Sequence, residues 1–180
     1  RETACRVAAG AVAKKMLLLS GIRTVAYTKE IGGIAGSTVD LDAIETNAVR
    51  AADSAAAAAM IHRIQEVQHE GDSLGGIIEV LVQGCPAGLG EPVFDKLNAR
   101  LAHAVMSIGA VKGIEFGDGF AAARQKGSMN NDAFVKTDAG VHSETNHAGG
   151  ILGGISNGET IILRIAVKPA SSIGQEQKTV

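Results

Sequence analysis

Tryptophan is absent from the 180-residue chain, and tyrosine occurs only once. Proteins that stack on the bases of single-stranded nucleic acid rely on such aromatic side chains, so this scarcity argues against nucleic-acid binding. The net charge of −2 agrees, because it leaves no basic excess to neutralise phosphates or an anionic membrane surface. We therefore expect neither nucleic acid nor a membrane as a partner.

Cysteines and long apolar runs are also scarce. Cys5 and Cys85 are too few for a disulfide framework, which favours two small buried residues in a reducing, cytoplasmic protein. No apolar run approaches the ~20 residues of a membrane span, and no signal peptide is expected. The chain starts without Met and stops without a terminal signal, which predicts a piece of a longer polypeptide.

The motifs of common catalytic sites are missing too. There is no H-E-x-x-H or cysteine spacing for zinc, no G-x-x-x-x-G-K-[ST] phosphate loop, no G-x-S-x-G turn and no convincing dinucleotide fingerprint. We therefore assign no metal site and no catalytic residue. Two of the five histidines, His62 and His103, are expected to be solvated helix positions. His147 borders a glycine cluster and is a candidate for lining a site.

Glycine, by contrast, is abundant, with 23 residues. Within residues 145–172, two Gly-Gly pairs precede a strand-like alternation that ends on Lys168, beside Ser171 and Ser172. Glycine pairs let a ligand lie against the main chain, and a lysine with hydroxyls can bind an anion. A lysine at a strand end is also often merely exposed. The residues alone indicate a phosphate- or cofactor-binding enzyme fragment.

Helical periodicity marks four segments. The first is expected to be a core helix, in which Gly10 packs closely against a neighbour. Asp40 is expected to cap the second helix and Ser54 the third, while Phe94 is expected to point inward from the fourth. The predicted helices are 2–19, 41–50, 55–69 and 94–107.

Alternating or continuous apolar runs mark four strands. The second run is nearly all apolar, which predicts a strand covered on both faces. The polar residues 125–144 are expected to be a lid or disordered. Mixed strands and helices without a linker favour one α+β or layered α/β domain over residues 1–180. The predicted strands are 22–31, 76–82, 111–116 and 160–167.

Several segments together resemble the chorismate synthase family, in the same order along the chain. They are R-E-T-A-C-R-V-A-A-G-A-V-A (1–13), E-G-D-S-L-G-G (70–76), G-L-G-E-P-V-F-D-K-L (88–97), S-I-G-A-V-K-G-I-E-F-G-D-G-F (107–120), N-N-D (130–132) and the glycine-rich stretch through K-P-A-S-S-I (145–173). The resemblance covers about the middle half of the family's chain.

The resemblance implies a layered β-α-β-α sandwich that assembles as a homotetramer. It further implies a lyase of the shikimate pathway, in aromatic amino acid biosynthesis. Such an enzyme converts 5-enolpyruvylshikimate-3-phosphate to chorismate and phosphate by 1,4-anti elimination. The reaction uses reduced FMN, with NADP among the associated small molecules. No flavin-reductase domain is visible, so an external reductant would supply the reduced flavin. The alternative is a non-catalytic FMN- or phosphate-binding module.

The resemblance also implies a set of site residues. Arg1 would bind substrate anions, and residues 125–144 would be a mobile cover. The family's functional histidines and its phosphate-binding arginines would lie outside this chain, so none of its histidines inherits a catalytic role. The implied flavin contacts are Gly109, Ala110, Gly153, Lys168, Pro169, Ala170, Ser171 and Ser172.

Overall fold

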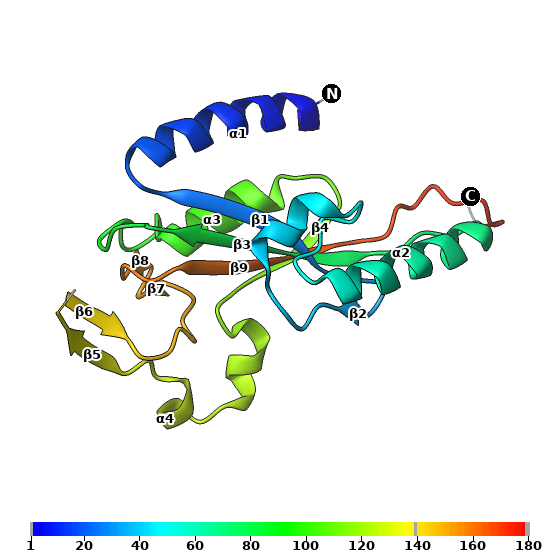
Figure 1. Cartoon of the computed structure of the whole chain (residues 1–180). Coiled ribbons are helices and arrows are strands. Elements are labelled where there is room, and N and C mark those ends of the chain that lie inside the picture. The colour runs from blue at the N-terminus through cyan, green and yellow to red at the C-terminus, as the bar shows by residue number, and fades with distance from the viewer. Residues whose placement is uncertain (1, 139, 179–180) are drawn as a thin grey trace. The chain divides into compact units, whose positions relative to one another are not determined.

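The computed structural model describes residues 2–138 and 140–178 (Figure 1). Helices and strands occur in mixed order, which confirms the predicted α+β class. Its helices are α1 (Glu2–Leu19), η1 (Leu41–Thr46), α2 (Ser54–His69), α3 (Leu97–Met106), η2 (Gly119–Arg124) and α4 (Gly127–Asn130). Its strands are β1 (Arg23–Ile31), β2 (Ile34–Ala35), β3 (Gly76–Gln83), β4 (Val111–Phe116), β5 (Phe134–Thr137), β6 (Gly140–Ser143), β7 (Ile151–Leu152), β8 (Ile155–Ser156) and β9 (Ile161–Val167).

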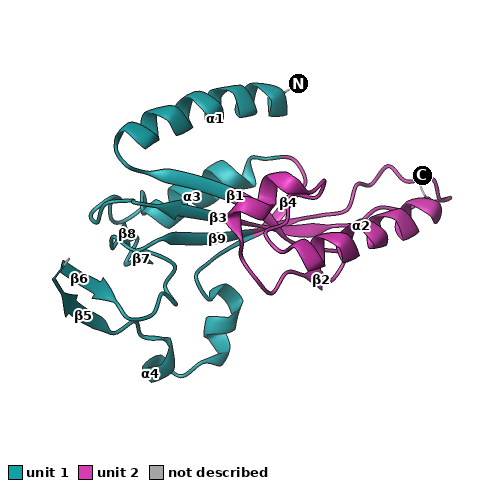
Figure 2. Cartoon of the chain, viewed as in Figure 1, with its two compact units in different colours: residues 1–25, 80–108, 114–164 teal, residues 26–79, 109–113, 165–180 magenta. Residues whose placement is uncertain are grey.

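Five strands form one sheet in the order β2-β1-β3-β9-β4, and β5-β6 and β7-β8 are two separate antiparallel pairs. The chain divides into two compact units (Figure 2), and the division passes through β1, β3, β4 and β9. Unit 1 comprises residues 1–25, 80–108 and 114–164, and unit 2 comprises residues 26–79, 109–113 and 165–180.

In unit 2, helix α2 packs through its alanine-rich side. Ala57 and Met60 are buried together with Ala51, which precedes the helix. The Asp53 carboxylate begins the helix, because its Oδ1 accepts hydrogen bonds from the Ala55 and Ala56 N–H groups at 3.0 Å each. The expected cap, Ser54, is instead the first helical residue. Asp53 is the cap because its second oxygen, Oδ2, also accepts hydrogen bonds from the N–H groups of residues 37 and 38.

Strand β9 follows the predicted alternation. Ile161, Leu163 and Ile165 are buried, while the residues between them are more exposed. Strand β3 is less covered than expected. Only one of its eight residues, Glu79, is buried. The Glu79 carboxylate accepts a hydrogen bond from the Tyr27 hydroxyl within unit 2, which accounts for a carboxylate at a buried position.

Helix α1 forms over the predicted residues but is not a core helix. None of its residues, all of which the structure describes, is buried. No described atom beyond its own helix lies within 4 Å of where a Cβ on Gly10 would be, so the expected close packing there is wrong. Cys5 is exposed as well, whereas Cys85 is buried as expected. The periodicity correctly predicted the helix but not its burial.

Two further helix predictions need correction. The segment 41–50 is a short 3₁₀ helix that ends at Thr46, although Asp40 caps it as expected. Helix α3 begins at Leu97, so Phe94 precedes it and is 90% exposed. Residues 125–144 are also more regular than expected, because they contain α4 and the β5-β6 hairpin.

Candidate functional site

The segment after β9 meets the segment before β4 in unit 2. The Lys168 N–H donates a hydrogen bond of 2.9 Å to the Ala110 carbonyl. Ala110 has a φ of 70°, a left-handed conformation that is uncommon for a residue with a side chain. No described atom beyond its chain neighbours comes within 4 Å of a Cβ placed on Gly109. Two of the three predicted flavin-contact segments therefore lie together, beside open space.

The loop 70–76 contacts the segment that follows β9. The Ser73 hydroxyl donates to the Ala170 carbonyl at 2.6 Å, while the Ser73 N–H donates to Asp72 Oδ1 at 2.8 Å. A Cβ on Gly75 would lie 2.7 Å from the Val167 carbonyl oxygen, so only glycine fits there. The contact with Ala170 was not predicted, although E-G-D-S-L-G-G was one of the resembling segments.

A cavity of about 590 Å³ opens in unit 2. Its lining is mostly apolar, with Ile64 and Val67 from α2 and Leu74 from the adjoining loop. Ser73 lines the cavity and also bonds Ala170. A cavity of this size and character suits a small organic ligand. The side chains of Lys168, Ser171 and Ser172 are exposed, so an ammonium and two hydroxyls are accessible on the same unit.

Gly153 belongs to unit 1, where it forms the turn between β7 and β8. Its φ is 61°, and no described atom outside its chain neighbours is within 4 Å of the Cβ position. Gly154 differs, because a Cβ there would collide with the Lys96 side chain and its carbonyl accepts the Leu97 N–H at 2.7 Å. The first glycine of the pair is thus open and the second is packed. Arg1, the predicted substrate contact, lies outside the described residues.

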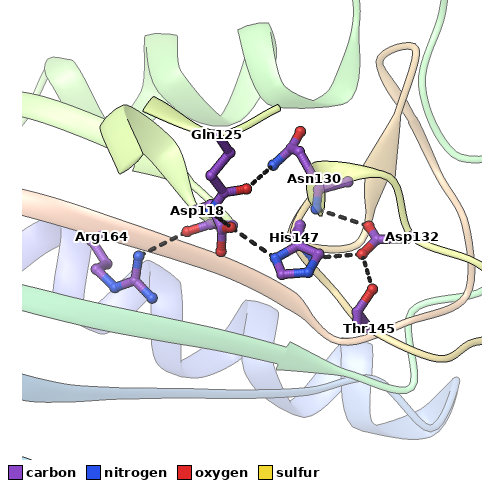
Figure 3. A network of polar contacts seen from close by, with 9 residues as sticks. Asp118, Gln125, Asn130, Asp132, Thr145, His147 and Arg164 are labelled. Atoms are coloured by element: carbon purple, nitrogen blue, oxygen red, sulfur yellow. Dashed lines mark hydrogen bonds and ion pairs between the residues drawn. The ribbon is translucent and has the colours of Figure 1, made fainter. Parts of the chain in front are cut away.

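Unit 1 also holds a polar network around two aspartates (Figure 3). His147 Nδ1 lies 2.7 Å from Asp118 Oδ2, and that oxygen also accepts the Gln125 amide at 2.7 Å. Gln125 Oε1 in turn accepts the Asn130 amide at 3.0 Å. The hydrogen bond from Gln125 and the contact with His147 outweigh partial burial and lower the pKa of Asp118. His147, which bordered the glycine cluster in the sequence, is thus bonded to a carboxylate.

Asp132 is the second aspartate of the network. It accepts the Thr145 hydroxyl at 2.7 Å and the backbone N–H groups of His147 and Ala148 at 2.7 and 2.9 Å. Partial burial raises the pKa of Asp132, but the three hydrogen bonds together lower it by more than burial raises it. The pKa of Asp132 is therefore below its ordinary value. Asp118 and Asp132 are therefore ionised at neutral pH. The sequence marked Asp132 only through the N-N-D segment.

No group of three or more His, Cys, Asp or Glu that could hold a metal ion occurs within residues 2–138 and 140–178. His62 and His103 are exposed on α2 and α3, as predicted. In the part of the chain that the structure describes, no helix is both long and apolar enough to cross a membrane.

Comparison with known proteins agrees with the sequence resemblance. A family model described as chorismate synthase matches residues 1–180, so the chain belongs to the chorismate synthase family. It is 56% identical over 180 residues to a chorismate synthase of Desulfosudis oleivorans, and 53% identical over 184 residues to one of Methanosarcina mazei. Each alignment covers 100% of this chain and 50% of the relative.

A solved structure titled "Crystal Structure of Chorismate Synthase" is similar in fold. The TM-score is 0.87 at 35% sequence identity, over 93% of this chain and 56% of that one. This match confirms an α+β fold of the chorismate synthase type. The chain spans about half the length of the curated relatives it matches.

Proposed function

We propose that the intact protein is a chorismate synthase, a lyase of the shikimate pathway. It converts 5-enolpyruvylshikimate-3-phosphate to chorismate and phosphate by 1,4-anti elimination, with reduced FMN as cofactor. The observation that carries this proposal is the family match over all 180 residues, with identities above one half to chorismate synthases. Because the chain spans half the length of those relatives, the activity is proposed for the intact protein.

The residues present fit an FMN molecule. Lys168 supplies a cation and Ser171 and Ser172 supply hydroxyls, which suit the phosphate or the ring oxygens of a flavin. The open backbone at Gly109 and Gly153 permits close approach, while Pro169 and Ala170 offer backbone contacts. Reduced FMN, when bound, would lend electron density to the substrate as its phosphate leaves.

The described residues bind and orient rather than transfer protons in this proposal. Lys168 holds an anionic oxygen, Ser73 fixes the backbone at Ala170, and residues 125–144 exclude water as a cover. Arg1 is proposed to bind substrate anions. We further propose that the intact protein is a cytoplasmic homotetramer. An external flavin reductant would supply its reduced FMN, with NADP among the associated small molecules.

The decisive experiment measures phosphate release by the intact protein. We expect turnover of 5-enolpyruvylshikimate-3-phosphate under anaerobic conditions with FMN kept reduced, and none with the flavin left oxidised. If no phosphate appears with substrate and reduced FMN in excess, although FMN binds, the protein is instead a flavin-binding module.

Lys168 provides a direct test of the cofactor site. Replacing a cation that bonds an anionic oxygen costs about 1.5–3 kcal/mol, so Lys168→Ala should weaken FMN binding about tenfold or more. Lys15→Ala, at an exposed position of α1, is the matched control and should leave the affinity unchanged. Equal flavin affinity in both variants, measured by fluorescence titration, would remove Lys168 from the site.

A further inference from the structure

One carboxylate closes the base of the β5-β6 hairpin in unit 1. Asp132 Oδ1 accepts the Thr145 hydroxyl and the His147 N–H, both at 2.7 Å, and Oδ2 accepts the Ala148 N–H at 2.9 Å. Both oxygens therefore bond to residues that follow the hairpin. Hydrogen bonds to a charged acceptor are about twice as strong as neutral ones, so Asp132 is a strong tie between the residues before β5 and those after β6.

The β5-β6 hairpin rises directly from this base. The Glu144 N–H donates to the Ala133 carbonyl at 2.8 Å, one residue beyond Asp132. The described residues of β5 are all exposed, and Phe134 and Val141 leave 61% and 65% of their surface uncovered. With so little buried area, the hairpin takes its direction from its attachments rather than from packing.

The same base is joined to the glycine-rich turn. The Asp118 N–H donates to the His147 carbonyl at 2.8 Å, and the Asn146 side chain accepts the Gly150 N–H at 2.8 Å. The backbone then runs through β7 to Gly153, whose surroundings are open. Asp132 is thus bonded to the turn that leads into the proposed flavin contact of unit 1 (Figure 3).

We propose that Asp132 is a positioning residue: it fixes the β5-β6 hairpin to the turn before Gly153, so that the hairpin covers bound substrate from one defined direction. This inference rests on the proposed function. A cover that is held at its base loses less conformational entropy when it closes. Substrate then binds at a lower concentration, so the KM is lower. Glu159 adds a second tie, because its Oε1 accepts the Ser143 N–H at 2.9 Å, so loss of Asp132 loosens the hairpin without releasing it.

The sharpest test is Asp132→Asn in the intact protein. Asparagine keeps the shape but turns one acceptor into a donor, which then faces an N–H or hydroxyl donor. Backbone amides of residues 134–137 and 140–143 should exchange hydrogen about tenfold faster, a factor that corresponds to about 1.4 kcal/mol. The KM for substrate should rise about fivefold or more, with a smaller loss of kcat.

Two further variants keep the test decisive. Asp42→Asn makes the same change at an exposed position outside the segment and should alter neither exchange nor KM. Thr145→Val removes one of the three donors and should give a smaller change in the same direction, which serves if Asp132→Asn folds poorly.

Each outcome bears on a different claim. Unchanged hairpin exchange in Asp132→Asn and Thr145→Val would overturn the attachment. Faster exchange with an unchanged KM would show that the attachment is structural only, and would overturn the positioning role. A wild-type protein that releases no phosphate would refute the proposed function, while the exchange measurement would still test the attachment.

Discussion

Helices α1 and α2 are alike in length and composition, yet they differ completely in burial. Helix α1 has 18 residues and α2 has 16, and both are rich in alanine with apolar residues at helical spacing. Helix α2 buries Ala57, Met60 and Val67. Within α1, all of it described, no residue is buried, and Leu19 is 90% exposed.

The contacts of the two helices explain the difference. Helix α2 is begun by Asp53 and packs on the partly buried Ile31 and Ile34 of β1 and β2. In α1, Arg6 donates to the Ser107 hydroxyl and carbonyl at 2.9 and 3.2 Å, on the exposed surface of unit 1. An apolar stripe therefore shows which face of a helix can be buried. Whether a neighbour covers that face is a separate question.

Matched methionines test this contrast with the largest expected effect. Met60 of α2 is fully buried, whereas Met16 of α1 is 66% exposed. Met60→Ala should lower the free energy of unfolding by about 2–5 kcal/mol, because it leaves a cavity, and Met16→Ala by less than about 0.5 kcal/mol. Denaturant unfolding of the intact protein measures both. A cost above about 2 kcal/mol for Met16→Ala would show that α1 is covered there.

Removing the cap of α2 should have the next largest effect. Asp53→Ala would leave the N–H groups of residues 37, 38, 55 and 56 without their carboxylate acceptor. We expect the midpoint of thermal unfolding to fall by about 3–6 °C. Asp42→Ala, which removes an exposed carboxylate nearby, is the control and should leave the midpoint unchanged. Equal midpoints in both variants would show that the cap contributes nothing.

The same cap predicts a pH dependence. Hydrogen bonds from the N–H groups of Ala56, Thr38 and Ser37 hold the pKa of Asp53 well below its ordinary value of 3.8. A lowered pKa contributes stability above the unfolded value, and that stability is lost as the pH falls through the folded pKa. The stability difference between wild type and Asp53→Asn should therefore stay constant between about pH 5 and pH 8 and shrink only below about pH 4. A change near neutral pH would contradict this assignment.

Gly10 gives the smallest and most discriminating effect. It lies inside α1 with no described atom outside the helix within 4 Å of the Cβ position. Gly10→Ala should therefore stabilise the protein by about 0.5–1 kcal/mol through higher helix propensity. Gly75→Ala should destabilise it, because its Cβ would meet the Val167 carbonyl. A destabilising Gly10→Ala would mean that another element lies against α1.

Most elements could be predicted from periodicity, but several of their ends could not. Strand β4 and helix α1 match the predicted residues, and β9 alternates as expected. The errors at Ser54 and Phe94 have a common cause. Asp53 is preferred as a cap because of its bonds to residues 37 and 38, and α3 begins only where the Leu97 N–H reaches the Gly154 carbonyl. Both depend on residues distant in sequence.

In the candidate site, too, some features could be predicted from the sequence and others are tertiary contacts. Lys168 and Ala110 were predicted to act together only through the family resemblance, and the hydrogen bond between them is a tertiary contact. The roles of Ser73 and Asp132 were missed, because Ser73 bonds to a residue 97 positions away and Asp132 to one 13 positions away. The flavin and substrate contacts themselves stay predictions.

The sequence by itself determined the family, the α+β class and the positions of the main helices and strands, because these depend on local periodicity and on motifs that stay together along the chain. Only the tertiary structure decided that α2 is buried and α1 is not, that Asp53 caps a helix, and that Asp132 joins the two ends of the β5-β6 hairpin. Burial and hydrogen bonding depend on which distant residues come within a few ångströms of each other, and no local pattern in this chain specifies that.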